Sequence, residues 1–253
     1  RLVATSAARG DFPLAKQRAK KLDTDNPFDY LELTSLSVDQ GDLKGALSLA
    51  QKGMVLAQPE SDLGARYMIL PVAVVSLLSN DNPAAARHAK DAAQKALAAI
   101  DKGIVSDSEE DAALALGAAL VAQRAGDRGL ATTVLASLEK QPMLLKIPQI
   151  EELAAVVRAQ EARLSGKPQE AIRILRPYQN GRERFQTRVV LMDAFADSGE
   201  TEKAKEQAEW LKKRRGLAYV ELECGHCLQA LNVADSNRAA KRLLTATAVA
   251  GAN

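Results

Sequence analysis

A glycine followed five residues later by an alanine recurs along the chain and constrains its fold more than any other feature. Glycine ends a helix readily because it adopts the left-handed conformation that suits a helix C-terminus. An alanine early in the next helix lets two helices approach closely. The pattern therefore predicts helical hairpins joined by short turns at Gly10 and Ala15, Gly41 and Ala46, Gly126 and Ala131, Gly166 and Ala171, and Gly199 and Ala204.

Two looser copies place a polar residue in the glycine position. These are Asn80 with Ala85 and Asp235 with Ala240. The seven markers lie 31, 39, 46, 40, 33 and 36 residues apart, and this spacing predicts about seven hairpins. Pro168 suits the first turn of a helix.

The composition agrees with a helical chain and excludes several function classes. Alanine, the strongest helix former, accounts for 46 of the 253 residues. No segment alternates apolar and polar residues over a sustained length, so we expect no sheet. The net charge of +2 argues against a polyanion binder, and we expect no nucleic-acid partner. No apolar run reaches the ~18 residues of a membrane span.

The pattern resembles the tetratricopeptide repeat (TPR), a helix-turn-helix unit of about 34 residues. The match is clearest over 27–59 and 152–216, although the spacing here is uneven and the family's usual Trp, Gly and Tyr of the first helix are mostly absent. The residues that occupy its small and apolar positions are Ala159, Ala171, Tyr178, Phe195, Ala204, Ala208 and Leu211.

The resemblance implies an all-α fold, a right-handed superhelix of about seven stacked antiparallel helix pairs. We expect one domain over 1–253. Because the chain begins at Arg1 rather than Met, we expect it to be a processed chain or part of a longer one. The expected hairpins lie near 1–26, 27–59, 62–101, 108–142, 149–178, 183–214 and 217–247.

First helices line the inner surface of TPR proteins, so the resemblance implies a groove there for a protein or peptide ligand. Arg124 and Arg163 predict a basic middle of this groove, and Asp193 and Asp197 an acidic end. The full set of candidate partner-binding residues is Ser35, Asp39, Gln123, Arg124, Gln160, Arg163, Gln186, Asp193 and Asp197.

Cys224-Gly225-His226-Cys227 is similar to the active-site motif of protein disulfide isomerases, in which a neighbouring imidazole and a helix N-terminus stabilise the thiolate. A thioredoxin fold needs strands on both sides of such a motif, and only 26 residues follow Cys227. The main interpretation is two small buried cysteines in the last hairpin; redox activity at Cys224 and Cys227 is the alternative.

The rest of the sequence carries no dinucleotide, P-loop or zinc-protease motif. We expect a non-enzymatic scaffold or sensor domain without cofactor or metal, in a larger bacterial signalling or assembly protein. The runs WLKKRRGLAYVELE (210–223) and LQALNVADSNRA (228–239) are similar to the C-terminal ends of bacterial TPR-bearing signalling proteins. The alternatives are a thiol-disulfide oxidoreductase and a structural module of a membrane or secretion complex. A homo-oligomer and a cytoplasmic or periplasmic location stay open.

Overall fold

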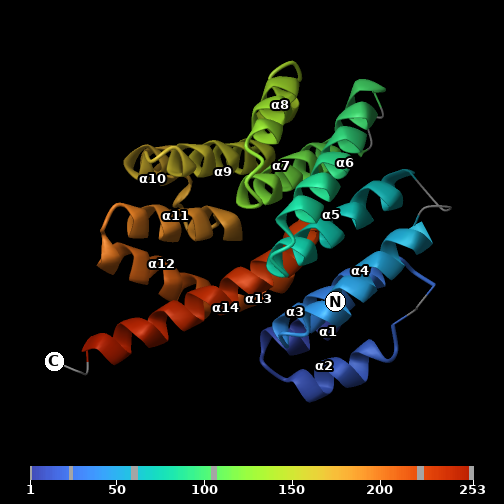
Figure 1. The fold of residues 1–253 in the computed structure, drawn as a ribbon, viewed down its shortest axis with the longest axis horizontal. Helices are drawn as coiled ribbons and strands as arrows, with labels where there is room; N and C mark the ends of the chain where they lie inside the picture. Colours follow the sequence, from blue (N-terminus) through green and yellow to red (C-terminus); the bar gives the residue numbers. More distant parts are fainter. Residues whose placement is uncertain (1, 23–24, 58–61, 104–106, 221–224, 251–253) are drawn as a thin grey trace.

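The computed structural model describes residues 2–22, 25–57, 62–103, 107–220 and 225–250, and every regular element in these ranges is a helix. The prediction of an all-α chain is therefore confirmed. The α-helices are labelled in Figure 1, and the 3-10 turns η2 (Leu144–Lys146) and η3 (Arg176–Tyr178) lie between them. The α-helices are α1 (Leu2–Ala8), α2 (Phe12–Ala19), α3 (Asp29–Asp39), α4 (Leu43–Ala57), α5 (Asp62–Leu78), α6 (Asn82–Asp101), α7 (Ser108–Arg124), α8 (Gly129–Leu138), α9 (Pro148–Leu164), α10 (Pro168–Leu175), α11 (Phe185–Asp197), α12 (Thr201–Lys213), α13 (Arg215–Val220) and α14 (Gly225–Ala250).

Six of these helices are followed by the same turn. Its marker residue has a positive φ, between 63° at Asn80 and 97° at Gly126. The next residue donates its N–H to the carbonyl five residues earlier, the bond that closes a Schellman C-cap. The prediction that the glycines end helices in a left-handed conformation is confirmed, and so is the looser copy at Asn80. The six bonds run from Asp11 to Ser6, Asp42 to Ser37, Asp81 to Ser76, Asp127 to Ala122, Lys167 to Ala162 and Glu200 to Phe195.

The alanines that follow these turns are buried, as expected of residues between paired helices. Ala15, Ala46, Ala85, Ala131, Ala171 and Ala204 are each at most 1% exposed. Each helix packs on its partner across the turn, and α5, α6 and α7 pack together in a contiguous part of the core. Pro168 stands in the first turn of α10, as predicted.

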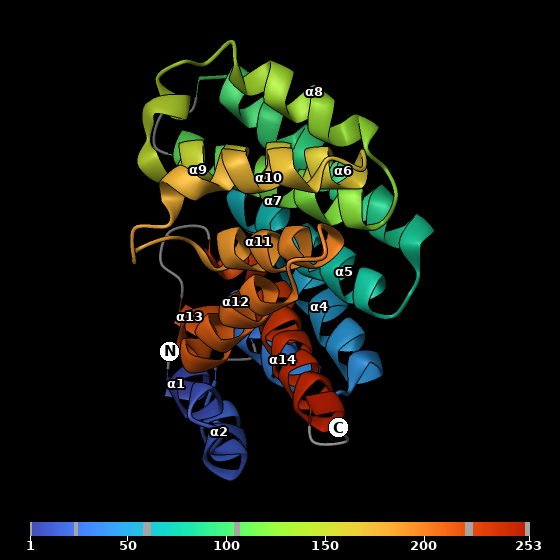
Figure 2. The ribbon, with the colours of Figure 1, turned by 90° about the vertical axis from the view of Figure 1, so that its left-hand side faces the viewer.

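The chain does not run straight from end to end. Figure 2 shows it rising from α1–α2 to α8 and coming back through α9–α12, so that α13 lies beside α1. The long helix α14 then packs against α3, α5, α12 and α13, with smaller contacts to α7 and α11. Its C-terminal end extends past α12 (Figure 1). In an open solenoid each repeat contacts only its neighbours, so this return of the last helix to the early ones is the main departure.

The prediction that Asp235 takes the glycine position of a seventh turn is wrong. Asp235 lies inside the helix α14, and the boundary between α13 and α14 falls at 221–224, outside the described residues. The reason is tertiary: the Asp235 carboxylate is buried and accepts hydrogen bonds from Arg124 of α7 and Gln186 of α11. Its hydrogen-bonding capacity is taken up by these side chains rather than by the backbone N–H groups of a helix N-terminus.

Candidate partner-binding face

Four of the expected groove residues lie together against the C-terminal hairpin. They are Asp39 at the end of α3, Arg124 at the end of α7, and Gln186 and Asp193 on α11. We call these four residues and the helices that carry them the docking face. The residues that they contact, on α13 and α14, lie 45 to 198 positions away along the chain.

At the centre of the docking face, Asp235 of α14 is enclosed by hydrogen-bond donors. Arg124 donates from Nη1 to Asp235 Oδ2 at 2.8 Å, and Gln186 donates from Nε2 to the same oxygen at 3.0 Å. Arg124 Nη2 also donates to Gln186 Oε1 at 2.7 Å, which holds the guanidinium and the amide in register. Gln186 Nε2 reaches Asn232 Oδ1 as well, at 2.7 Å.

Neighbouring charged side chains set the direction of the pKa shifts of Asp235 and Arg238. Burial by itself raises the pKa of Asp235, but Arg124, Arg238 and the amide of Gln186 outweigh it and hold that pKa below its usual value. Arg238, which lies one turn further along α14, pairs in a bidentate fork with Asp193 at 2.6 and 3.0 Å. Despite partial burial, Asp235 and Asp193 together raise the pKa of Arg238. Asp235 is thus a carboxylate and Arg238 a guanidinium cation at neutral pH.

Asp39 forms a second, smaller cluster with the C-terminal hairpin. Its carboxylate is 2% exposed and accepts from Arg215 and from the Tyr219 hydroxyl, both of α13. Asn237 of α14 donates from Nδ2 to Asp39 Oδ1 at 3.0 Å and accepts from Arg215 at 2.7 Å. Burial, and then the hydrogen bond to Asp39, raise the pKa of Tyr219, so its hydroxyl stays a donor.

The other five expected residues do not contact α14 through any polar bond among the described residues. Ser35 is buried and its hydroxyl donates to the Leu31 carbonyl of its own helix. Gln123 is buried and donates to Glu161 and to the Val157 carbonyl of α9.

Arg163 and Asp197 link α9 to α11 at 2.8 Å, and buried Gln160 accepts from Arg163 at 3.2 Å. Arg163 thus pairs with Asp197, and Arg124 pairs with Asp235, while the separation into a basic middle and an acidic end stays a prediction.

The sequence reasoning missed the residues that α14 contributes. Asn232, Asp235 and Arg238 are spaced three apart, which places them on one side of a helix. This spacing could have indicated a polar contact surface on the helix. It is common on solvent-exposed helices, however, and only the structure shows that the docking face lies opposite these residues. A second missed residue is Gly117 of α7: a Cβ there would lie 3.3 Å from Cδ2 of both Leu228 and Leu70, so the absence of a side chain lets α14 and α5 approach α7.

The cysteine motif receives no structural test. Cys224 lies outside the described residues, and of Cys227 only the backbone, at the start of α14, is described. Among the described residues, no group of three or more His, Cys, Asp and Glu side chains is arranged to hold a metal ion.

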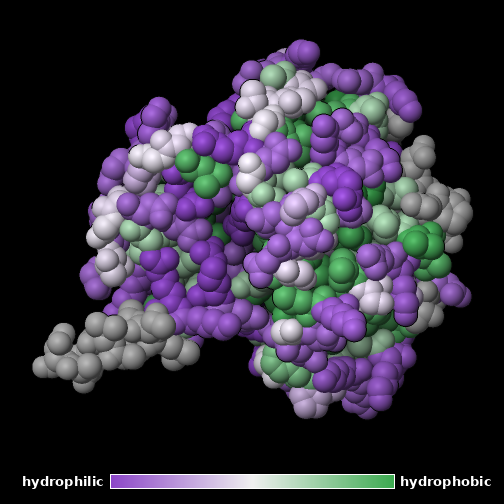
Figure 3. All heavy atoms as spheres, viewed as in Figure 1, coloured by the Kyte–Doolittle hydropathy of each residue, from purple (hydrophilic) through white to green (hydrophobic). Residues whose placement is uncertain are grey.

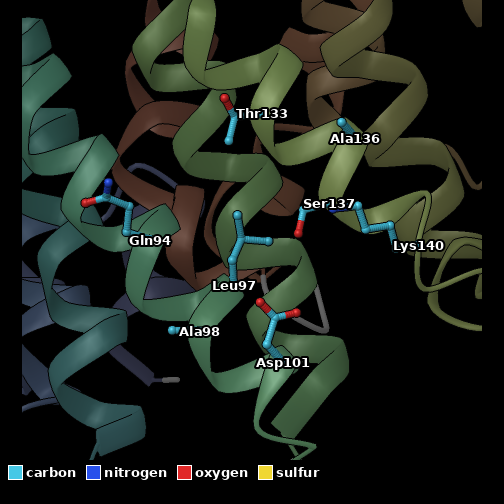
Figure 4. Close-up of a pocket in the computed structure, with 8 residues that line it drawn as sticks. All are labelled: Gln94, Leu97, Ala98, Asp101, Thr133, Ala136, Ser137 and Lys140. Atoms are coloured by element: carbon cyan, nitrogen blue, oxygen red, sulfur yellow. The ribbon is translucent and has the colours of Figure 1, made fainter.

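Two other surfaces are less specific. A hollow of about 430 Å³ lies between α6 and α8 (Figure 4). Apart from Leu97, the side chains that line it are short or polar: Gln94, Ala98, Asp101, Thr133, Ala136, Ser137 and Lys140. On the face shown in Figure 3, apolar side chains gather in the region that α4 crosses. Val55 of α4 is 64% exposed. Neither surface brings together buried polar groups as the docking face does.

None of the described helices has both the length and the apolar character needed to cross a membrane. Comparison of the chain with protein-family models, with curated proteins and with solved structures gave no match.

Proposed function

We propose that the chain is a non-enzymatic, TPR-like interaction domain that binds a helix of a partner protein on the docking face. In this proposal the helix pairs form a right-handed superhelix of about seven units. Six identical turns and the buried alanine after each support the repeat character.

The observation that carries the proposal is that a helix already lies on this face. α14 is held there through Arg124, Gln186 and Asp193, which bind its side chains by ion pairs and amide hydrogen bonds. Such bonds carry orientation and specificity more than raw affinity. The ligand we infer is therefore helical, with polar side chains on one side, and differs from the extended peptide that the resemblance leaves equally open.

The experiment starts from the intact chain and the protein that it captures from its own organism. Chemical cross-linking followed by mass spectrometry should join that partner to α3, α7, α11 or α14. Links confined to the second helices α4, α6, α8 and α10 would contradict the proposal.

A competition experiment provides the second readout. An excess of a synthetic peptide with the sequence of residues 228–250 should displace the captured partner. The matched control is the same peptide with alanine at Asn232, Asp235 and Arg238, which should leave the partner bound. Equal displacement by both peptides, or by neither, would contradict binding at the docking face.

A further inference from the structure

α14 differs from the other second helices of the pairs in what it buries. The described buried residues of α2, α4, α6, α8, α10 and α12 are Ala, Gly, Leu, Ile and Val, with Gln207 of α12 as the one polar exception. Within eight residues of α14, by contrast, four polar side chains are at most 5% exposed: Gln229, Asn232, Asp235 and Ser236.

This polar burial opposes the packing of α14 on the other helices. Neither amide atom of Gln229 has a hydrogen-bond partner in the structure, although the side chain is buried. A buried polar group without a partner opposes burial, because water would satisfy it. The Asp235 ion pairs largely offset the cost of removing their own charges from water and add little net stability.

The docking-face residues on α7 and α11 contact three side chains of α14, and Asp39 of α3 contacts a fourth, Asn237. Gln186 donates to Asn232, Arg124 donates to Asp235, and Asp193 accepts from Arg238. Any helix with Asn, Asp and Arg at positions i, i+3 and i+6 offers the same acceptors and donors in the same order. A helix without them would leave Arg124 and Asp193 without their partners.

We propose that α14 is an exchangeable occupant of the docking face, and that the partner is a protein helix with an Asn-x-x-Asp-x-x-Arg pattern that takes the place of α14. This inference rests on the proposed function and adds to it the chemistry of the partner and the means of regulation. An occupant in the same chain reduces the apparent affinity for a partner by the fraction of chains in which the face is free.

The test uses the full chain and a fluorescent peptide of residues 228–250. The double variant Asp235→Asn and Arg238→Gln weakens α14 without changing the net charge. Its matched control, Glu139→Gln with Arg158→Gln, removes a solvent-exposed ion pair at 3.4 Å between the α8 end and α9. Hydrogen exchange of α14 and peptide affinity are measured for each protein.

The expected result is faster exchange in α14 alone and at least tenfold tighter peptide binding by the double variant than by the native chain or the control. If α14 stays as protected as α11 in the double variant, or if all helices lose protection together, α14 is an integral part of the core and the exchange proposal is wrong. If α14 alone exchanges rapidly and the peptide still does not bind, the docking face does not bind helices and the proposed function fails. Binding of equal strength to all three proteins would overturn only the claim that α14 competes.

Discussion

Replacing Asp235 with alanine removes the acceptor at the centre of the docking face, and the structure gives the size of the effect. Arg124 would lose a 2.8 Å ion pair while its side chain remains 15% exposed, so water can reach it only in part. Breaking a buried pair from one side costs about 3–5 kcal/mol. The lower end applies here, because Arg124 keeps its hydrogen bond to Gln186 and Arg238 keeps Asp193.

We therefore expect Asp235→Ala to lower the free energy of unfolding by about 3 kcal/mol, roughly a hundredfold in the equilibrium constant. Urea unfolding followed by circular dichroism at 222 nm and by the fluorescence of the single tryptophan, Trp210, measures this. The control is Asp197→Ala, which breaks the pair with Arg163 at a site where the carboxylate is 44% exposed, and which should cost at most about 1 kcal/mol. Equal losses for the two variants would refute the reasoning.

Three further outcomes follow from the same structure. The folded pKa of Asp235 lies below its usual value of 3.8, so the stability that its carboxylate supplies is complete above pH 3.8 and is lost as pH falls through the folded pKa. When the free energy of unfolding is measured at decreasing pH, it should fall less steeply for Asp235→Asn than for the native chain. Gly41 has a φ of 78°, so Gly41→Ala should lower stability by about 1–2 kcal/mol in urea unfolding, although a Cβ there meets no atom within 4 Å. Ala171 is fully buried where α10 meets its neighbours, and Ala171→Leu should lower the melting temperature, through about 1–3 kcal/mol of overpacking; an unchanged melting temperature would show that the small side chain is not required.

Local structure was predictable because its causes are local. A glycine that must adopt a positive φ, and an alanine five residues later that must fit between two helices, leave a trace in the sequence at each turn. Asn80 carries the same trace, since asparagine tolerates the left-handed region better than most residues.

The site was predictable only in part, because its causes are distant in sequence. Arg124 and Gln186 were expected to face a partner, and both do contact a helix, but that helix comes from the same chain, 111 and 49 residues away from them at Asp235. Asp235 itself was assigned to a turn because the pattern of one hairpin cannot show that a carboxylate will be enclosed by an arginine and a glutamine from other hairpins.

The central claim is that the docking face holds a helix through ion pairs with its charged side chains. Exchanging the charges of one pair tests this claim most directly. Arg238 and Asp193 form a bidentate pair in which the Arg238 side chain is 45% exposed and the Asp193 side chain 15% exposed, so the charges of the pair can be exchanged at a site that water partly reaches. Hydrogen exchange of the α14 amides is measured in Arg238→Asp, in Asp193→Arg and in the double exchange. Each single variant should speed exchange in α14, and the double variant should return it toward the native rate. A double variant whose acceleration is the sum of the two single ones would contradict the claim.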